Sequence, residues 1–163
     1  MSEASSNPPS RRPFPAVELA IAAFCAWRSA DLLHAWHQSP YDRLGWLALL
    51  LWCLPALPGL TGPRWARPGP EPLAYLPWVA VALAMLGVVT SLNFLTYWAL
   101  ACAVVSLHRT GRHDLVWLGL AIGWMPVLGW VGTRFPPLAI TVTRLAISVG
   151  AAVLVVYLRK RAD

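Results

Sequence analysis

The scarcity of charged side chains constrains this chain most. Charged residues make up 12% of the 163 residues and hydrophobic residues 58%, whereas soluble domains carry about 25% charged residues. So few charges cannot cover a surface that faces water, but a bilayer tolerates an apolar exterior. The composition therefore predicts an all-α, polytopic integral membrane protein. Short loops and the lack of eukaryotic sorting signals favour a bacterial plasma (inner) membrane and a multi-pass arrangement.

Hydropathy divides the chain into apolar runs, each of which we expect to form a transmembrane helix. Six runs cover residues 15–36, 44–60, 73–89, 94–107, 115–132 and 138–158. A single helix over residues 73–107 would be about 52 Å long, too long for one crossing, so we expect a tight helical hairpin that turns at residues 90–93. Residues 1–13 predict a disordered cytoplasmic tail, and residues 159–163 a basic cytoplasmic tail.

The basic residues are distributed unevenly between the two sides of this six-helix transmembrane bundle. The two helical ones are Arg28 and Arg144. One side holds Arg11, Arg12, Arg64, Arg67, Arg109, Arg112, Arg159, Lys160 and Arg161, and the other holds Arg43 and Arg134. The positive-inside rule then places both termini in the cytoplasm. The net charge of +6 therefore reflects topology and not a nucleic-acid partner. The expected partners are the lipid bilayer and another membrane protein or a second copy of the chain.

Ionisable residues inside predicted spans are candidates for function because they are costly there. Arg28, Asp31 and His34 follow one another at i, i+3 steps along the first helix, and Arg144 lies in the sixth. The functional interpretation is a polar pocket open to the outer side, completed by Asn93. The alternative is a structural Arg–Asp pair, with Arg144 extending toward the membrane surface.

Motifs of soluble enzymes and of metal sites are lacking. The sequence contains no GxSxG, HExxH or P-loop pattern. Its three cysteines lie inside apolar runs without CxxC spacing. The histidine pairs His34/His37 and His108/His113 fall on opposite sides of the predicted membrane, so they cannot share one ion. We therefore expect no cofactor and no metal, and the catalytic residues stay unknown.

Two segments carry a resemblance to a known family. The segment HAWHQSPYDRLGWLALLLWCLP (residues 34–55) resembles the start of an exosortase or archaeosortase, a family of membrane transpeptidases. The segment GRHDLVWLGLAIGWMPVLGW (residues 111–130) resembles that family's Gly-Arg turn, apolar helix and Met-x-Pro-like ending. The matching positions are Trp36, Pro40, Tyr41, Leu44, Trp52, Gly111, Arg112, Met125 and Pro126.

The sequence departs from the family where its chemistry would lie. Asp42 and Arg43 follow Tyr41 in place of the family's His-Gly. The family's catalytic Cys, followed by Arg and His, falls beyond the last helix of this chain, so no catalytic residue can be carried over. The resemblance implies at most a truncated or degenerate cysteine-transpeptidase relative with an outer-facing polar pocket.

Three functions are compatible with these patterns. A non-catalytic subunit or accessory factor, acting through helix packing with a partner, fits the small size and the short loops best. An exosortase-like relative is the alternative that the resemblance implies. A small oligomeric transporter, with an intramembrane arginine that attracts an anion, is the third.

Overall fold

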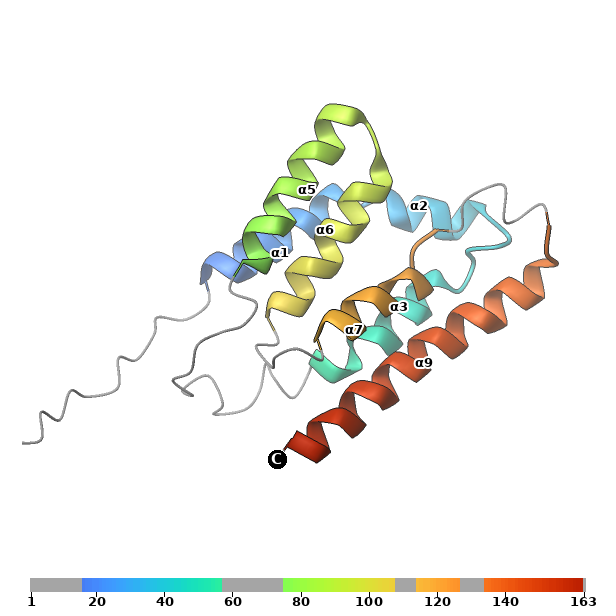
Figure 1. Cartoon of the computed structure of the whole chain (residues 1–163). Helices are drawn as coiled ribbons and strands as arrows, with labels where there is room; N and C mark the ends of the chain where they lie inside the picture. Colours follow the sequence, from blue (N-terminus) through green and yellow to red (C-terminus); the bar gives the residue numbers. More distant parts are fainter. Residues whose placement is uncertain (1–15, 57–74, 108–113, 127–133, 163) are drawn as a thin grey trace, which may run out of the picture.

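The computed structural model describes residues 16–56, 75–107, 114–126 and 134–162, and this part of the chain is helical without any strand (Figure 1). The all-α prediction is thereby confirmed for these ranges. The α-helices are α1 (Ala16–Arg28), α2 (Asp31–Gln38), α3 (Gly45–Cys53), α5 (Leu76–Thr90), α6 (Asn93–Ser106), α7 (Asp114–Gly119) and α9 (Pro137–Ala162). Two 3-10 segments, η1 (Leu54–Ala56) and η3 (Leu120–Gly123), continue α3 and α7.

The helices form two groups that lie against each other. α1 packs on the α5–α6 hairpin, and α9 packs on α3, α7 and η3 (Figure 1). The groups meet where α6 contacts α7 and where α2 leads into α3. The buried side chains of both groups belong to one continuous apolar core.

The α5–α6 hairpin follows the predicted pattern. α5 ends at Thr90 and α6 begins at Asn93, so the predicted turn at residues 90–93 is confirmed. Ser91 closes α5 in the left-handed conformation with φ of 55°, and the N–H of Leu92 donates to the Gly87 carbonyl at 3.1 Å. This bond is typical of a helix that ends on a residue in the left-handed conformation.

The predicted single helix over residues 15–36 is wrong, because the chain breaks between α1 and α2. Around Ser29 and Ala30 the backbone makes tighter bonds, from the Ala30 N–H to the Trp27 carbonyl and from the Leu32 N–H to the Ser29 carbonyl. The Ser29 hydroxyl donates to the Thr96 carbonyl of α6 at 3.0 Å. This bond holds the break between α1 and α2 against α6.

Two further helices end earlier than predicted. The run over residues 44–60 forms α3 only to Cys53 and then η1, because Pro55 has no N–H to continue the helical ladder. Residues 57–60 lie outside the described ranges. The run over residues 115–132 forms α7 and η3, and regular helix stops at Gly123. Residues 127–132 are also outside the described ranges, as are residues 1–13.

A reciprocal pair of tryptophans holds α3 against α7. The Trp52 indole N–H donates to the Trp117 carbonyl, and the Trp117 indole N–H donates to the Trp52 carbonyl, both at 3.0 Å. The two rings lie 4.9 Å apart, and Trp124 packs 5.8 Å from Trp52 on the same cluster. All three side chains are fully buried. Both carbonyls come shortly before a 3-10 segment, where the α-helical ladder ends and a carbonyl can accept from outside.

α9 is the one described helix that is long and apolar enough to cross a membrane. Its segment Pro137–Leu158 has 22 residues and a mean hydropathy of 2.1, whereas the other apolar helices have 10–17 residues. Membership in a six-span bundle is therefore not established by helix length. α9 continues to Ala162. This corrects the prediction that the helix ends at residue 158 before a separate tail.

Gly45 allows α3 to start against Trp36. A methyl group added at Gly45 would lie 2.1 Å from Nε1 of the buried Trp36 indole. We expect Gly45→Ala to force the indole aside and to lower the free energy of unfolding by about 1–3 kcal/mol, as overpacked sites do. Detergent-solubilised protein titrated with a denaturing detergent would give this value.

Gly150→Ala is the matched control for Gly45→Ala. A methyl group at Gly150 meets no atom within 4 Å, and the position lies inside α9. Alanine favours helix over glycine, so this variant should be as stable as the parent or more so. Equal stability of the two variants would show that Trp36 does not pack on Gly45 as described.

Candidate functional site

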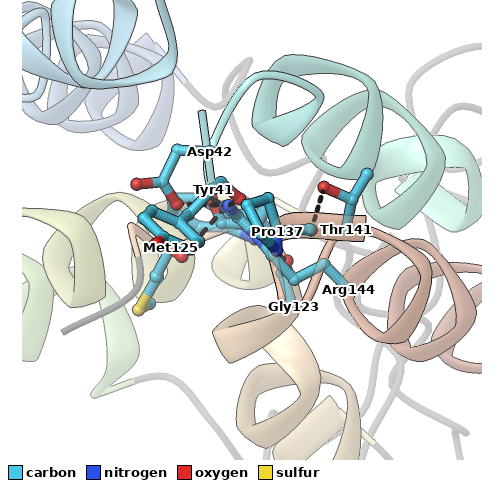
Figure 2. Close-up of polar contacts among 8 residues, drawn as sticks. Tyr41, Asp42, Gly123, Met125, Pro137, Thr141 and Arg144 are labelled. Atoms are coloured by element: carbon cyan, nitrogen blue, oxygen red, sulfur yellow. Dashed lines mark hydrogen bonds and ion pairs between the residues drawn. The ribbon is translucent and has the colours of Figure 1, made fainter. Parts of the chain in front are cut away.

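Arg144 projects from α9 into the junction of three segments. It lies on the buried stripe of α9 with Ile140, Ser148, Ala151 and Val155, and it is 6% exposed. Spacings of three and four residues place these side chains on one helical face. That face packs against α3 and η3. Figure 2 shows the guanidinium reaching toward Tyr41 and Asp42 on one side and the end of η3 on the other.

Every N–H of the Arg144 guanidinium has an acceptor. Nε donates to the Gly123 carbonyl at 3.0 Å, and Nη2 donates to the carbonyls of Trp124 at 2.8 Å and Met125 at 3.0 Å. Nη1 donates to the Tyr41 carbonyl at 3.1 Å and forms an ion pair with the Asp42 carboxylate. A guanidinium carries five N–H donors, so these five acceptors use all of them.

Among the described residues, no space for a ligand is left at this guanidinium. The void beside Arg144 is lined by Tyr41, Leu44 and Thr141 and is too small for a water molecule. The Asp42 side chain is also buried. The arrangement is a closed ion pair that connects the 39–44 segment and the end of η3 to α9. Its role is to stabilise the packing of these segments.

Asp31 of α2 makes a second polar contact, with α6. Its carboxylate accepts from the Tyr97 hydroxyl of α6 at 2.6 Å. The other carboxylate oxygen, Oδ1, is buried without a hydrogen-bond partner. The Tyr97–Asp31 hydrogen bond joins α6 to α2.

The five predicted site residues do not form one pocket. Arg144 pairs with Asp42 and is buried, which corrects the prediction that Arg144 extends toward the membrane surface. Arg28 is half-buried, with its guanidinium carbon 5.6 Å from the Trp27 ring centre and its Nε without a partner. His34 and Asn93 are exposed.

The sequence pattern indicates Arg144 and Asp31, but it does not indicate Asp42 and Tyr97, the side chains that contact them. Asp42 stands in a short polar connection, where a carboxylate is expected to face solvent. Tyr97 stands inside an apolar run, where an aromatic residue is expected to pack. Positions 42 and 144 are 102 residues apart, so no local pattern connects them. A charged residue inside a predicted helix requires an opposite charge. A search for the carboxylate that pairs with Arg144 could have indicated Asp42.

No metal site is built by the residues within the described ranges, where no three His, Cys, Asp or Glu side chains gather. Comparison with protein-family models, with characterised proteins and with solved structures finds no match. The resemblance to the exosortases therefore stays a prediction.

The Arg144 network should not tolerate lysine. Lys has three donors on one nitrogen and cannot reach five acceptors arranged around a planar fork. We expect Arg144→Lys to lower the free energy of unfolding by about 2–4 kcal/mol, because it leaves buried acceptors unpaired. Arg134→Lys, at an exposed position before α9, is the control and should change stability by less than about 0.5 kcal/mol. A tolerated Arg144→Lys would contradict the five-acceptor network.

Proposed function

We propose that this chain is a multi-pass protein of the inner membrane that acts without catalysis, as a subunit or accessory factor that packs its helices against a partner membrane protein. The observation that carries the proposal is the apolar exterior of otherwise well-packed helices. The small-residue face of α9 and the fully paired guanidinium of Arg144 also support it.

Large apolar side chains are exposed on each described α-helix. Trp78 of α5 is 69% exposed and Val153 of α9 is 62% exposed. Monomeric soluble proteins rarely expose contiguous apolar patches of more than a few hundred Å². Lipid tails or apolar side chains of another protein are the surroundings in which such a surface is stable.

α9 presents a face suited to close helix packing. Ala139, Thr143, Ala146 and Gly150 are small, exposed and spaced by four, three and four residues. This spacing places them along one side of the helix, away from the Arg144 stripe. Small residues at such intervals let two helix backbones approach closely in lipid, where apolar burial supplies little attraction between helices. A transmembrane helix of another protein is the partner that we propose for this face.

Six crossings with both termini in the cytoplasm remain the topology that we propose. The uneven distribution of basic residues supports it. α5 and α6 have 15 and 14 residues, or roughly 21–23 Å, against about 30 Å for the hydrocarbon core. The proposal therefore includes a locally thin bilayer beside this hairpin, which is a known response to short helices.

The closed state of Arg144 argues against direct roles in catalysis or transport for that residue. Its donors are all engaged by the protein, so none is left for a substrate carboxylate or a transported anion. Breaking this network to bind a ligand would expose five buried acceptors. A packing role needs no such rearrangement.

Replacement of the small residues on α9 tests the partner. We expect Gly150→Leu to obstruct helix approach and to reduce recovery of a stoichiometric membrane partner in mild-detergent affinity purification at least about ten-fold, a difference of 1.4 kcal/mol. Val149→Leu is the matched control, because Val149 is exposed on another side of the same turn. Unchanged recovery with Gly150→Leu, or recovery of the parent protein alone, would contradict the proposal.

Reporter fusions test the topology. We expect a fluorescent protein to be active at both termini, and alkaline phosphatase to be active when fused after Arg43 or Arg134, because these two segments are the poorly charged ones. The protein should also stay in the membrane pellet after alkaline carbonate washing. Phosphatase activity at the C-terminus would exclude an even number of crossings, and release by carbonate would exclude integral insertion.

A further inference from the structure

A groove opens at the junction of α2 and α3, and its lining does not include the ion pair of Asp42 and Arg144. It encloses about 570 Å³ and is open to the outside. Its polar lining comes from His37, Gln38, Ser39 and Arg43, and its apolar lining includes Leu33 and Trp46. This groove, which we call the α2–α3 groove, is far larger than the void beside Arg144.

The backbone around the groove is held in place before any ligand binds. The Ser39 N–H donates to the Ala35 carbonyl, the Asp42 N–H to the Ser39 carbonyl, and the Gly45 N–H to the Asp42 carbonyl. Arg144 fixes the carbonyl of Tyr41 and the carboxylate of Asp42. Ordering a flexible segment on binding costs affinity, and a segment fixed in advance avoids this cost.

Arg43 supplies a free positive charge at the groove. Its neighbour Asp42 is buried toward Arg144, whereas Arg43 is exposed. Within the described ranges, Arg43 has no hydrogen bond or ion pair. His37 is exposed on the last turn of α2 and lines the same groove. A guanidinium matches the geometry of a phosphate, with two parallel N–H···O bonds.

The apolar lining distinguishes the kind of phosphate. Leu33 is 66% exposed and Trp46 is 47% exposed, so a ligand that lies along them contributes apolar surface. Trp favours the boundary between headgroups and acyl chains, where one side of its ring is apolar and its N–H finds a polar partner. A cation and a Trp at one helix junction fit a molecule with a phosphate and an acyl chain.

We propose that the α2–α3 groove binds an anionic phospholipid, with the headgroup phosphate on Arg43 and His37 and the acyl chain along Leu33 and Trp46. The site rests on the proposed membrane function, in which the groove faces the outer leaflet. A free phosphate ion shares the headgroup chemistry but makes no use of the apolar lining. The bound lipid covers an apolar surface beside the ion pair and stabilises the α2–α3 junction.

Native mass spectrometry of the full-length protein tests the site. The protein is purified in mild detergent and titrated with phosphatidylglycerol, with phosphatidylcholine or with inorganic phosphate. We expect retention of phosphatidylglycerol, and about a five-fold loss of that retention in Arg43→Gln, the fold-change of a lost charge-assisted phosphate contact. Arg134→Gln, which removes an exposed charge outside the groove, is the control and should retain the lipid as the parent does.

The remaining outcomes distinguish the sources of the ligand. Competition by millimolar inorganic phosphate, with equal retention of both lipids, would overturn the lipid assignment in favour of a free anion. Equal phosphatidylglycerol retention by Arg43→Gln and the parent would overturn the site while leaving membrane insertion intact. Failure of the proposed function would appear separately, as release of the protein by alkaline carbonate. An unchanged melting temperature of Arg43→Gln in detergent without added lipid, expected for an exposed residue, confirms that the variant is folded.

Discussion

The five hydrogen bonds of one arginine determine how the second helix group is assembled. A guanidinium in an apolar interior is costly unless every donor is paired, so the packing of α9 is possible only where five acceptors converge. The chain supplies four of them as backbone carbonyls, three of which come from the end of η3. The end of η3 can supply these acceptors, because carbonyls at a helix terminus have no partner inside the helix and can accept from the Arg144 guanidinium. Asp42 provides the opposite charge.

This constraint also orders the surroundings of the ion pair. Because Asp42 is directed inward, Arg43 is left outward, and the segment between α2 and α3 has one buried and one exposed face. Gly123 belongs to the same arrangement, since a methyl group there would lie 2.9 Å from side-chain atoms of Ile147 and Ser148. The close approach of η3 to α9 thus depends on a residue without a side chain. The hydrogen bonds of Arg144 and the absence of a side chain at Gly123 together set the distance between η3 and α9.

The sequence predicts the helices well where a polar turn separates two apolar runs. Asn93 begins α6 and Pro137 begins α9 close to the expected positions, because local composition changes sharply at both sites. The break at Ser29 escapes such reasoning, since no local signal marks it and the Ser29 hydroxyl bonds to the Thr96 carbonyl 67 residues away. The charged residues Asp31 and Arg144 were predicted as costly groups inside the expected spans. Their partners, Asp42 and Tyr97, were not, because a loop carboxylate and a helical tyrosine look ordinary until the chain is folded.

The two tryptophans that exchange hydrogen bonds set the alignment of α3 with α7. Two helices in an apolar environment can slide along each other with little change in buried area, so side-chain packing alone resists such movement weakly. A slide by one residue shifts the backbone by about 1.5 Å. That shift would stretch one of the two Trp52–Trp117 bonds and misalign the other, so both indoles would lose their acceptors together. The two opposed hydrogen bonds therefore form together in only one register of α3 against α7.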